Sequence, residues 1–325
     1  MTDAVRTGPF KVWCNQPFGD AGVEQLKHGL AGHSLLYQPG RDEPNDDLES
    51  AHVVFGKPAV ASLLRSEALQ WLHVGSAGYT PWDREDLLQR FRVRKILFSR
   101  SSMVYCEPCA EQVLSLMLSW ARRLPWALDA QRGARQWRYG EIRSQSRLLV
   151  GQSALIVGFG TIGERLCELL KPFEMQIVAV RQRVRGDEPV LTISVSDPRL
   201  DEFLGNTDHV INLMPLNAST AGFFDHRRLS AIRPGAIFYN IGRGGTVDQQ
   251  ALLRLAQAGH FGALLLDVTE PEPLPVDHPL WSAPNCFITP HSAGGHDNEQ
   301  ERLVSHFLNN FNRFITHQPL LDRVV

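Results

Sequence analysis

The sequence predicts an α/β protein of two Rossmann-like domains, each a doubly wound parallel sheet. Short apolar runs such as 51–55, 72–75 and 154–157 alternate with helix-like stretches along most of the chain. This alternation is typical of parallel sheets that carry helices on both faces. The 325 residues suit two domains, at roughly 150 residues for each. One of the apolar runs also leads directly into a turn with three glycines.

Composition and charge exclude several other classes of protein. Apolar residues make up 43% of the chain and charged residues 21%, which argues against a disordered, collagen-like or coiled-coil protein. The 33 basic residues nearly balance the 35 acidic ones, so the net charge favours no nucleic-acid or membrane partner. Five scattered cysteines and an N-terminus without an apolar signal segment predict a cytoplasmic location.

Two breaks in the pattern predict how the domains are connected. Pro108 opens a long apolar run, and because proline suits the first turn of a helix, we expect a helix to start there and cross between domains. A second break precedes a helical pattern over residues 298–315. We therefore expect a discontinuous substrate (catalytic) domain over 1–107 plus 292–325, with a dinucleotide-binding domain over 108–291 inserted into it.

The glycine turn follows the apolar run 154–157 and precedes leucines at helical spacing. Its three glycines, Gly158, Gly160 and Gly163, form the pattern G-x-G-x-x-G. The first permits a tight turn, the second lets phosphates approach the backbone, and the third lets helix and strand pack closely. The start of the helix then directs N–H groups toward a pyrophosphate. In this strand–turn–helix context, the motif predicts dinucleotide binding.

The next predicted strand, 176–180, ends where NAD-binding proteins place an acidic residue on the ribose. This chain has Arg181 there, followed by Arg183 and Arg185. An arginine removes the carboxylate that would repel a 2′-phosphate, and guanidinium groups suit phosphate oxygens. We therefore expect NADP(H) to be preferred, with NAD(H) possible. The alternative is that these arginines lie on a solvated loop.

Four charged side chains lie at or beyond the ends of later apolar runs: Arg243, Asp267, Glu272 and His291. Open parallel sheets place their ligands at the carboxyl ends of the strands. Taken singly, each residue is also compatible with an ordinary loop charge, a turn cap or a surface histidine.

Together, the stretches around these residues resemble the D-isomer-specific 2-hydroxyacid dehydrogenases. The matching segments are VGFGTIGERL, RPGAIFYNIGRGGTVDQQAL, LLLDVTEPEPLPVDHPLW and PNCFITPHSAGG, in the family order over most of residues 148–296. In addition, LQWLHVGSAGYT is similar to the family's substrate-carboxylate loop. The resemblance implies two domains with a cleft between them and the reduction of small 2-keto acids, of the glyoxylate or hydroxypyruvate type, to D-2-hydroxy acids.

The resemblance also implies catalytic roles. His291 is the expected general acid/base, Glu272 its carboxylate partner, and Arg243 the clamp on the substrate. Reduction of a 2-keto acid requires hydride at the carbonyl carbon and a proton at the carbonyl oxygen, and histidine can supply that proton near neutral pH. An arginine can hold the substrate carboxylate and polarise the carbonyl.

Further contacts are implied by position in the family pattern alone. The nicotinamide carboxamide is assigned to Asp267, and the substrate carboxylate to the backbone N–H groups of Ala77 and Gly78. At Thr80 the chain departs from the family, whose members commonly carry aspartate there. The remaining expected cofactor contacts are Thr161, Ile162, Pro215, Ile241, Gly242 and Gly294.

The same residues are also compatible with other functions. A phosphoglycerate-type dehydrogenase would need basic groups near Lys57, and a dinucleotide-sensing binding protein like the transcriptional corepressors of this fold would keep the same polar residues. Formate-specific relatives pair their histidine with glutamine, whereas Glu272 is acidic. Phosphite-oxidising relatives use a lysine at the position of Ala77. The pair Cys106 and Cys109 is interpreted as packing, and no metal site is expected.

The expected partners are a small 2-keto or 2-hydroxy acid and a second copy of the chain. Family members usually dimerise through the cofactor domain, and Trp126 and Trp137 are candidate interface aromatics. Neither a nucleic-acid nor a membrane partner is expected.

Overall fold

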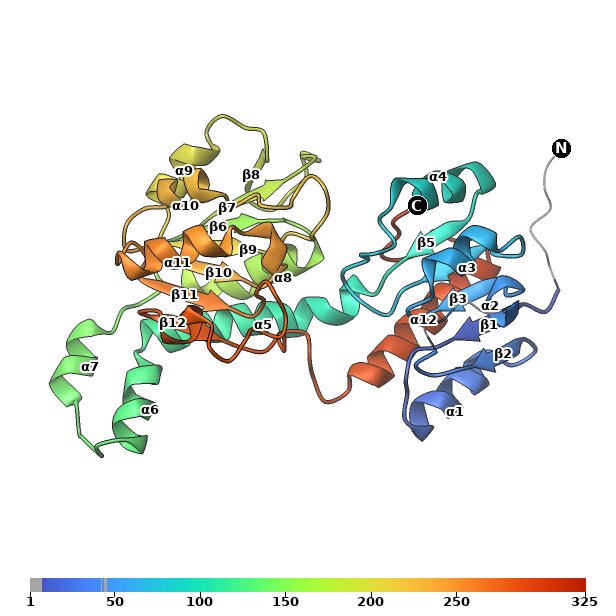
Figure 1. The fold of residues 1–325 in the computed structure, drawn as a ribbon, viewed down its shortest axis with the longest axis horizontal. Helices are drawn as coiled ribbons and strands as arrows, with labels where there is room; N and C mark the ends of the chain where they lie inside the picture. Colours follow the sequence, from blue (N-terminus) through green and yellow to red (C-terminus); the bar gives the residue numbers. More distant parts are fainter. Residues whose placement is uncertain (1–7, 42, 44–45) are drawn as a thin grey trace. The chain divides into compact units, whose positions relative to one another are not determined.

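The computed structural model describes residues 8–41, 43 and 46–325 and divides the chain into two compact units. Unit 1 contains the chain up to Tyr105 together with His296–Val325, and unit 2 is Cys106–Gly295. Each unit is a parallel sheet accompanied by helices (Figure 1), which confirms the predicted α/β class with two parallel sheets. Residues 1–7, part of the N-terminus expected to lack a signal peptide, lie outside the described residues.

Unit 1 is a sheet in the order β2-β1-β3-β4-β5, with every neighbouring pair parallel. The chain order reverses between β1 and β3, which places a topological switch point between these two strands. Its strands are β1 (Lys11–Cys14), β2 (Ser34–Tyr37), β3 (Val53–Phe55), β4 (Trp71–His73) and β5 (Leu97–Ser99). Its helices are α1 (Asp20–Gly29), α2 (Asp46–Glu49), α3 (Val60–Arg65), α4 (Glu85–Arg94) and α12 (Glu299–Ile315).

Helix α12 brings the end of the chain back to unit 1 and completes its core. Phe307 is fully buried, and its ring stacks on Phe55 with 4.2 Å between centroids and on Trp71 with 5.3 Å. The other buried apolar residues of the helix recur at helical spacing, as an amphipathic helix requires. They are Leu303, Val304, Phe311 and Phe314.

A buried polar cluster attaches the last residues of the chain to the same unit. The Asp322 carboxylate accepts a hydrogen bond from Met103 N at 2.7 Å and lies 3.4 Å from Nε2 of His306. Burial raises the pKa of Asp322 and lowers the pKa of His306, because each charged form loses hydration. The C-terminal segment is thus held along β5, where Val324 N donates to Phe98 O at 2.7 Å.

Unit 2 is a parallel sheet in the order β12-β11-β10-β9-β6-β7-β8. The order reverses between β6 and β9, and this is the point at which such sheets bind ligands. Its strands are β6 (Ser153–Val157), β7 (Gln176–Arg181), β8 (Leu191–Ser194), β9 (His209–Asn212), β10 (Ile237–Asn240), β11 (Ala263–Leu266) and β12 (Cys286–Ile288). Its helices and 3₁₀ turns are α6 (Leu124–Arg132), α7 (Tyr139–Gln145), α8 (Thr161–Leu170), η1 (Lys171–Phe173), α9 (Leu200–Asn206), α10 (His226–Ala231), η2 (Gly244–Thr246), α11 (Gln249–Gln257) and η3 (Pro279–Ser282).

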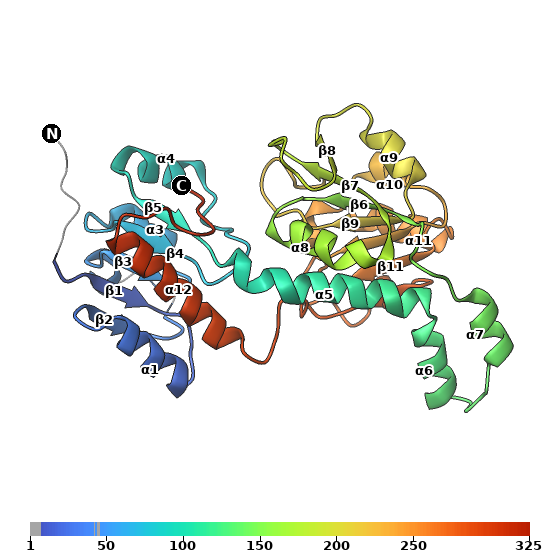
Figure 2. The same cartoon turned by 180° about the vertical axis from the view of Figure 1, so that it is seen from behind.

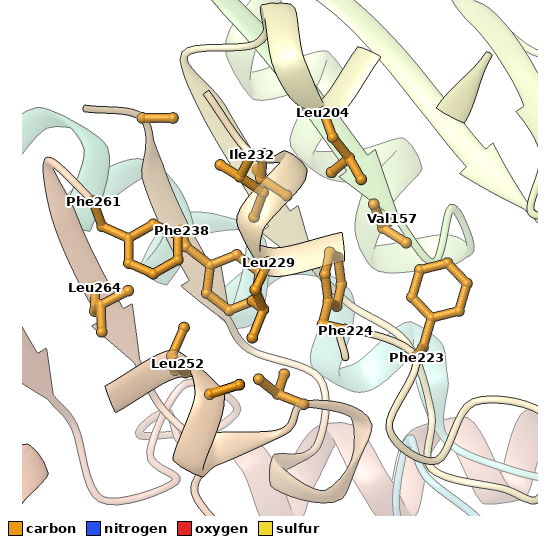
Figure 3. Packing of buried hydrophobic residues seen from close by; sticks show 14 of the residues in the cluster. Val157, Leu204, Phe223, Phe224, Leu229, Ile232, Phe238, Leu252, Phe261 and Leu264 are labelled. Atoms are coloured by element: carbon orange, nitrogen blue, oxygen red, sulfur yellow. The ribbon is translucent and has the colours of Figure 1, made fainter. Parts of the chain in front are cut away.

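The core of unit 2 is rich in aromatic rings packed edge to face (Figure 3). Phe224 contacts Phe223 with 5.3 Å between centroids and Phe238 with 5.0 Å. Leu229 of α10 and Leu252 of α11 cover these rings. This dense packing under the sheet holds the ends of the strands, where the predicted site residues lie, on a rigid support.

Helix α5 (Ser102–Ala121) begins before the proline that was expected to open it, so that expectation was wrong. Pro108 lies inside the helix, where it cannot donate to the carbonyl of Val104. The earlier start has a tertiary cause, because the Tyr105 hydroxyl in the first part of the helix donates to Gly75 O at 2.9 Å. The division between the two units falls within this helix.

Helices α6 and α7 form an arm that extends beyond the sheet of unit 2 in both views (Figures 1 and 2). The second helix of the arm, α7, is short and has no buried residue. In the described part of the chain, no helix is both long enough and apolar enough to cross a membrane.

Candidate active site

The glycine turn after β6 packs against the end of β7 and the loop after β9. The N–H groups of Gly158 and Phe159 both donate to Val180 O at 3.0 Å. Gly158 has a φ of 95°, and a Cβ there would lie 2.6 Å from Met214 N. Only glycine fits this position, since any side chain would be strained and would strike backbone.

Helix α8 begins directly after this turn with Thr161 and Ile162. The N–H groups of a first helical turn have no partner within the helix, and the structure shows none for these two among the described residues. A Cβ on Gly160 would meet no atom within 4 Å, whereas one on Gly163 would lie 2.9 Å from the Phe159 ring. Open space before a free helix N-terminus fits the pyrophosphate of a dinucleotide.

The loops after β9 and β10 close the same region. A Cβ on Gly242 would lie 2.5 Å from Met214 O, and Ile241 N donates to Asn212 O at 3.0 Å. Pro215 directly follows Met214 in the chain. Of the cofactor contacts that the resemblance implies, the fold therefore groups the glycine turn, Pro215, Ile241 and Gly242 at the switch point of the sheet.

A buried polar network that the sequence analysis missed supports these loops. Asn212 Nδ2 donates to Asn240 Oδ1 at 2.9 Å and to Thr246 Oγ1 at 2.7 Å. In turn, Asn240 Oδ1 accepts from Gly242 N at 3.2 Å and Asn212 Oδ1 from Met214 N at 3.1 Å. In the sequence, this network is indicated by an asparagine at the end of each of two strand segments, HVIN and IFYN. Asparagines buried in this way must be hydrogen-bonded, so they define loop geometry.

The arginines after β7 are partly neutralised by acidic side chains. Arg181 Nη1 lies 3.2 Å from Oε1 of Glu188, and Arg185 Nη2 lies 2.6 Å from Oε1 of Glu164. The backbone N–H of Arg185 donates to Glu188 and lowers the pKa of that carboxyl. Within the described ranges, no acidic group lies within ion-pair distance of Arg183. Of the three arginines, Arg183 thus lacks a direct acidic partner.

Arg243 lies in the loop after β10, which packs against the loop after β11. A Cβ on Gly244 would lie only 1.9 Å from Thr269 O, so the two loops are in backbone contact. The Arg243 guanidinium donates to Gly242 O at 2.6 Å, and its own carbonyl accepts from Thr246 Oγ1 at 2.6 Å. The half-buried side chain is therefore held by its own loop, without an ion pair to any residue that the structure describes.

Asp267 follows β11 and is buried, with 2% of its surface exposed. Its carboxylate accepts hydrogen bonds from Thr289 Oγ1 at 2.5 Å, Ser292 N at 3.0 Å and Ala293 N at 3.1 Å. In the structure this carboxylate organises the turn after β12. The contact with a nicotinamide carboxamide stays a prediction.

His291 stands in that turn with a φ of 49°. Its backbone N–H donates to Asp267 O at 2.8 Å, and its ring Nδ1 forms a 2.8 Å hydrogen bond with Oε2 of Glu272. The second carboxylate oxygen of Glu272 accepts from Thr269 N at 3.0 Å. The side chains of His291 and Glu272 are 46% and 37% exposed, so the pair is accessible to a ligand. Gly294 belongs to the same turn.

Cys109 in helix α5 is a buried thiol. Burial, with a smaller contribution from the charge of Asp267, raises the pKa of Cys109 to about 12, so its thiol is protonated at neutral pH. No group of three or more histidine, cysteine or acidic side chains among the described residues is placed to hold a metal ion.

Ala77 and Gly78 belong to unit 1, in the loop after β4. Their N–H groups donate to no acceptor among the residues that the structure describes. Successive free N–H groups form a concavity suited to an anion. This loop therefore has the chemistry that a carboxylate site needs.

Comparison with known proteins identifies the family. Residues 114–293, more than half of the chain, match the model of the NAD binding domain of D-isomer specific 2-hydroxyacid dehydrogenases. The human protein named glyoxylate reductase/hydroxypyruvate reductase is 29% identical over 204 residues, which cover 63% of this chain and 62% of that one. The protein named glyoxylate/hydroxypyruvate reductase B from Klebsiella pneumoniae strain 342 is 34% identical over 220 residues, or 66% of each chain. These matches thus span slightly less than two thirds of either relative.

Solved structures agree over nearly the whole chain. A D-isomer specific 2-hydroxyacid dehydrogenase from Xanthobacter autotrophicus Py2, in complex with NADPH and MES, is 25% identical with a TM-score of 0.83 and 98% coverage of both chains. The protein TT0316 from Thermus thermophilus is 27% identical with a TM-score of 0.75, covering 97% of this chain and all of that one. The chain therefore belongs to the D-isomer specific 2-hydroxyacid dehydrogenase family and is an NAD(P)-dependent oxidoreductase of the class that acts on CH–OH groups.

Proposed function

We propose that the protein reduces small 2-keto acids of the glyoxylate or hydroxypyruvate type to D-2-hydroxy acids, with NADP(H) as the preferred cofactor. The observation that carries this proposal is the 2.8 Å hydrogen bond between His291 Nδ1 and Glu272, formed beyond the strand ends of a sheet whose switch point fits a dinucleotide. The names of the human and Klebsiella relatives support the substrate class.

His291 is the proposed general acid. With Nδ1–H donating to Glu272, Nε2 is the nitrogen that exchanges a proton with substrate, and no described residue competes for it. The carboxylate accepts the hydrogen bond from Nδ1–H and so orients the ring, whose Nε2–H delivers a proton to the carbonyl oxygen. A bound nicotinamide dinucleotide supplies the hydride to the carbonyl carbon.

Arg243 is the proposed substrate clamp. Its backbone is anchored by Thr246 and its guanidinium donates to Gly242 O, which leaves further N–H donors of the fork for a ligand. A guanidinium can hold a carboxylate through two parallel hydrogen bonds. Its positive charge also stabilises the negative charge that develops on the carbonyl oxygen. In the other unit, the N–H groups of Ala77 and Gly78 are proposed to bind the substrate carboxylate.

The NADP(H) preference rests on Arg181 and Arg183. Arg181 ends β7, next to the glycine turn, and its charge is shared with Glu188. Arg183 is exposed and has no acidic partner among the described residues, so its guanidinium is available to a 2′-phosphate. A phosphate with two negative charges can compete with one carboxylate for Arg181.

A homodimer is proposed through the arm of unit 2. Trp137 on the arm is 92% exposed, and Tyr139, Leu148 and Val150 are more than half exposed. Such exposed apolar side chains on one segment are typical of a surface that another protein covers. Trp126 is different, because its ring packs on Trp120 with 4.7 Å between centroids.

The first prediction concerns the substrate. When NADPH absorbance is followed with glyoxylate, hydroxypyruvate, pyruvate and phenylpyruvate, we expect turnover to be most efficient with the first two, because these are the substrates named for the relatives. Binding of NADPH without turnover of any of the four would instead favour the dinucleotide-sensing alternative.

The second prediction concerns the acid/base pair. His291→Gln should lower kcat by about 10²–10⁴-fold, the usual contribution of a positioned general acid, while the unfolding temperature stays close to that of the wild type. Glu272→Gln keeps an acceptor for Nδ1–H but loses the charge, so it should cause a smaller loss. His28→Gln is the matched control at an exposed position. A wild-type kcat in His291→Gln would contradict the role.

The third prediction concerns cofactor choice. The double variant Arg181→Ser, Arg183→Ser should raise the KM for NADPH by about tenfold or more, the value of one lost charge-assisted hydrogen bond. The KM for NADH should stay nearly constant, since NADH carries no 2′-phosphate. Arg199→Ser, at an exposed arginine paired with Asp197, serves as control. Equal changes for both cofactors would show that the arginines serve only the loop.

The fourth prediction concerns assembly. Sedimentation should show a species of about twice 36.5 kDa for the wild type, and Trp137→Asp should shift it toward the monomer because a buried unpaired charge is costly. Val276, which is 97% exposed and lies outside the arm, gives the control variant Val276→Asp. A wild-type monomer at micromolar concentration would refute the proposed dimer.

A further inference from the structure

The loop after β4 in unit 1 has an unusual distribution of hydrogen bonds. The carbonyls of Ser76, Ala77 and Gly78 each accept a hydrogen bond from within the unit. Their donors, in chain order, are Ser101 N at 3.1 Å, Arg100 Nη1 at 2.9 Å and the Ser76 hydroxyl at 2.6 Å. The Gly75 carbonyl shares the single proton of the Tyr105 hydroxyl with Oε1 of Glu299, each at 2.9 Å.

The same bonds orient the N–H groups of the loop. In a trans peptide, each carbonyl points opposite to the N–H of the next residue. The donors on the carbonyls of Ser76 and Ala77 therefore turn the N–H groups of Ala77 and Gly78 away from the bonded side. Among the described residues these N–H groups have no acceptor. The loop is thus prepared in advance for an anion.

Arg100 is the charged donor among these groups, and hydrogen bonds to its own backbone hold it in place. Its backbone N–H donates to Asp322 O at 3.1 Å, and its carbonyl accepts from His306 Nε2 at 3.2 Å. Its guanidinium also lies over the Tyr79 ring, 5.4 Å from the centroid. In the described part of the chain it has no acidic group within ion-pair distance, so its positive charge is not neutralised by a direct partner.

We propose that Arg100 is a positioning residue for the carboxylate of the substrate, acting through the peptide bond between Ala77 and Gly78. Its charged hydrogen bond to Ala77 O prevents that peptide from rotating and polarises it, which makes the N–H of Gly78 a stronger donor. The ligand class is a small carboxylate whose negative charge faces the loop. The inference rests on the proposed substrate role of Ala77 and Gly78.

Three substitutions at Arg100 separate the charge from the hydrogen bond. Arg100→Met should raise the KM for the keto acid about tenfold, as expected for the loss of one charge-assisted interaction, with a smaller change in kcat and an unchanged KM for NADPH. Arg100→Gln keeps a neutral N–H donor and should give an intermediate KM. Arg100→Lys keeps donor and charge and should come closest to the wild type.

Arg94 provides a matched control in the same unit. Its guanidinium also donates to backbone carbonyls, Ser66 O and Glu67 O, both at 2.6 Å, but in a different loop. Arg94→Met should therefore lower the unfolding temperature without changing the KM for the keto acid. If Arg94→Met and Arg100→Met raise that KM equally, the role of Arg100 is only structural and the proposal is overturned.

Binding of oxalate, measured by calorimetry in the presence of NADP⁺, separates this proposal from the proposed reaction. The wild type should bind oxalate, and Arg100→Met should bind it about tenfold more weakly, with Arg100→Gln as the second variant if the first does not fold. This result would support the role of Arg100 even if no keto acid is reduced. Oxalate binding that is absent in the wild type, or unchanged in both variants, would overturn it.

Discussion

The buried carboxylate of Asp267 is the constraint on which the candidate active site depends. Through one hydroxyl and two backbone N–H donors it holds the turn after β12, and its own carbonyl accepts from the N–H of His291. These bonds keep His291 in a left-handed backbone conformation that a histidine rarely adopts. The ring then meets Glu272 at hydrogen-bond distance. Without this support, the turn could relax and separate the acid/base pair, because strained conformations persist only when their surroundings determine them.

The loops around the glycine turn of unit 2 are also fixed by close contacts. Here the contacts are between backbone atoms at the ends of β6, β9 and β10. Gly158 and Gly242 both approach Met214 more closely than any side chain would allow. The buried side chains of Asn212 and Asn240 form a hydrogen bond with each other, and their oxygens accept hydrogen bonds from N–H groups of these loops. A buried amide that lost one of these partners would leave an unsatisfied polar group in the core. The loops therefore have little freedom, and a free helix N-terminus is left facing open space.

In unit 1, the loop after β4 is also held in one conformation, but by hydrogen bonds to its carbonyls. This loop contains no charged side chain between Gly75 and Gly78, yet the loop is suited to an anion because the carbonyls of residues 76–78 accept hydrogen bonds while the N–H groups of Ala77 and Gly78 stay free among the described residues. The donors come from the residues that directly follow β5 and from the loop itself. The C-terminal segment contributes as well, since Asp322 and His306 hold the backbone of Arg100. The last residues of the chain thus support a loop that lies far away in the sequence.

The spacing of apolar residues and glycines was enough to predict the α/β class, the glycine turn and helix α8. Such spacing is a property of residues that are neighbours in the chain. The similarity of four motifs also pointed to the family, and matching positions selected Arg243, Glu272 and His291 as candidates. Sequence could not show that Arg181 pairs with Glu188, or that Asp267 organises the histidine turn. It also could not place the start of α5, which lies before Pro108. These features depend on which strand ends become neighbours, and the order of strands in a sheet is decided by packing between segments that are distant in the chain.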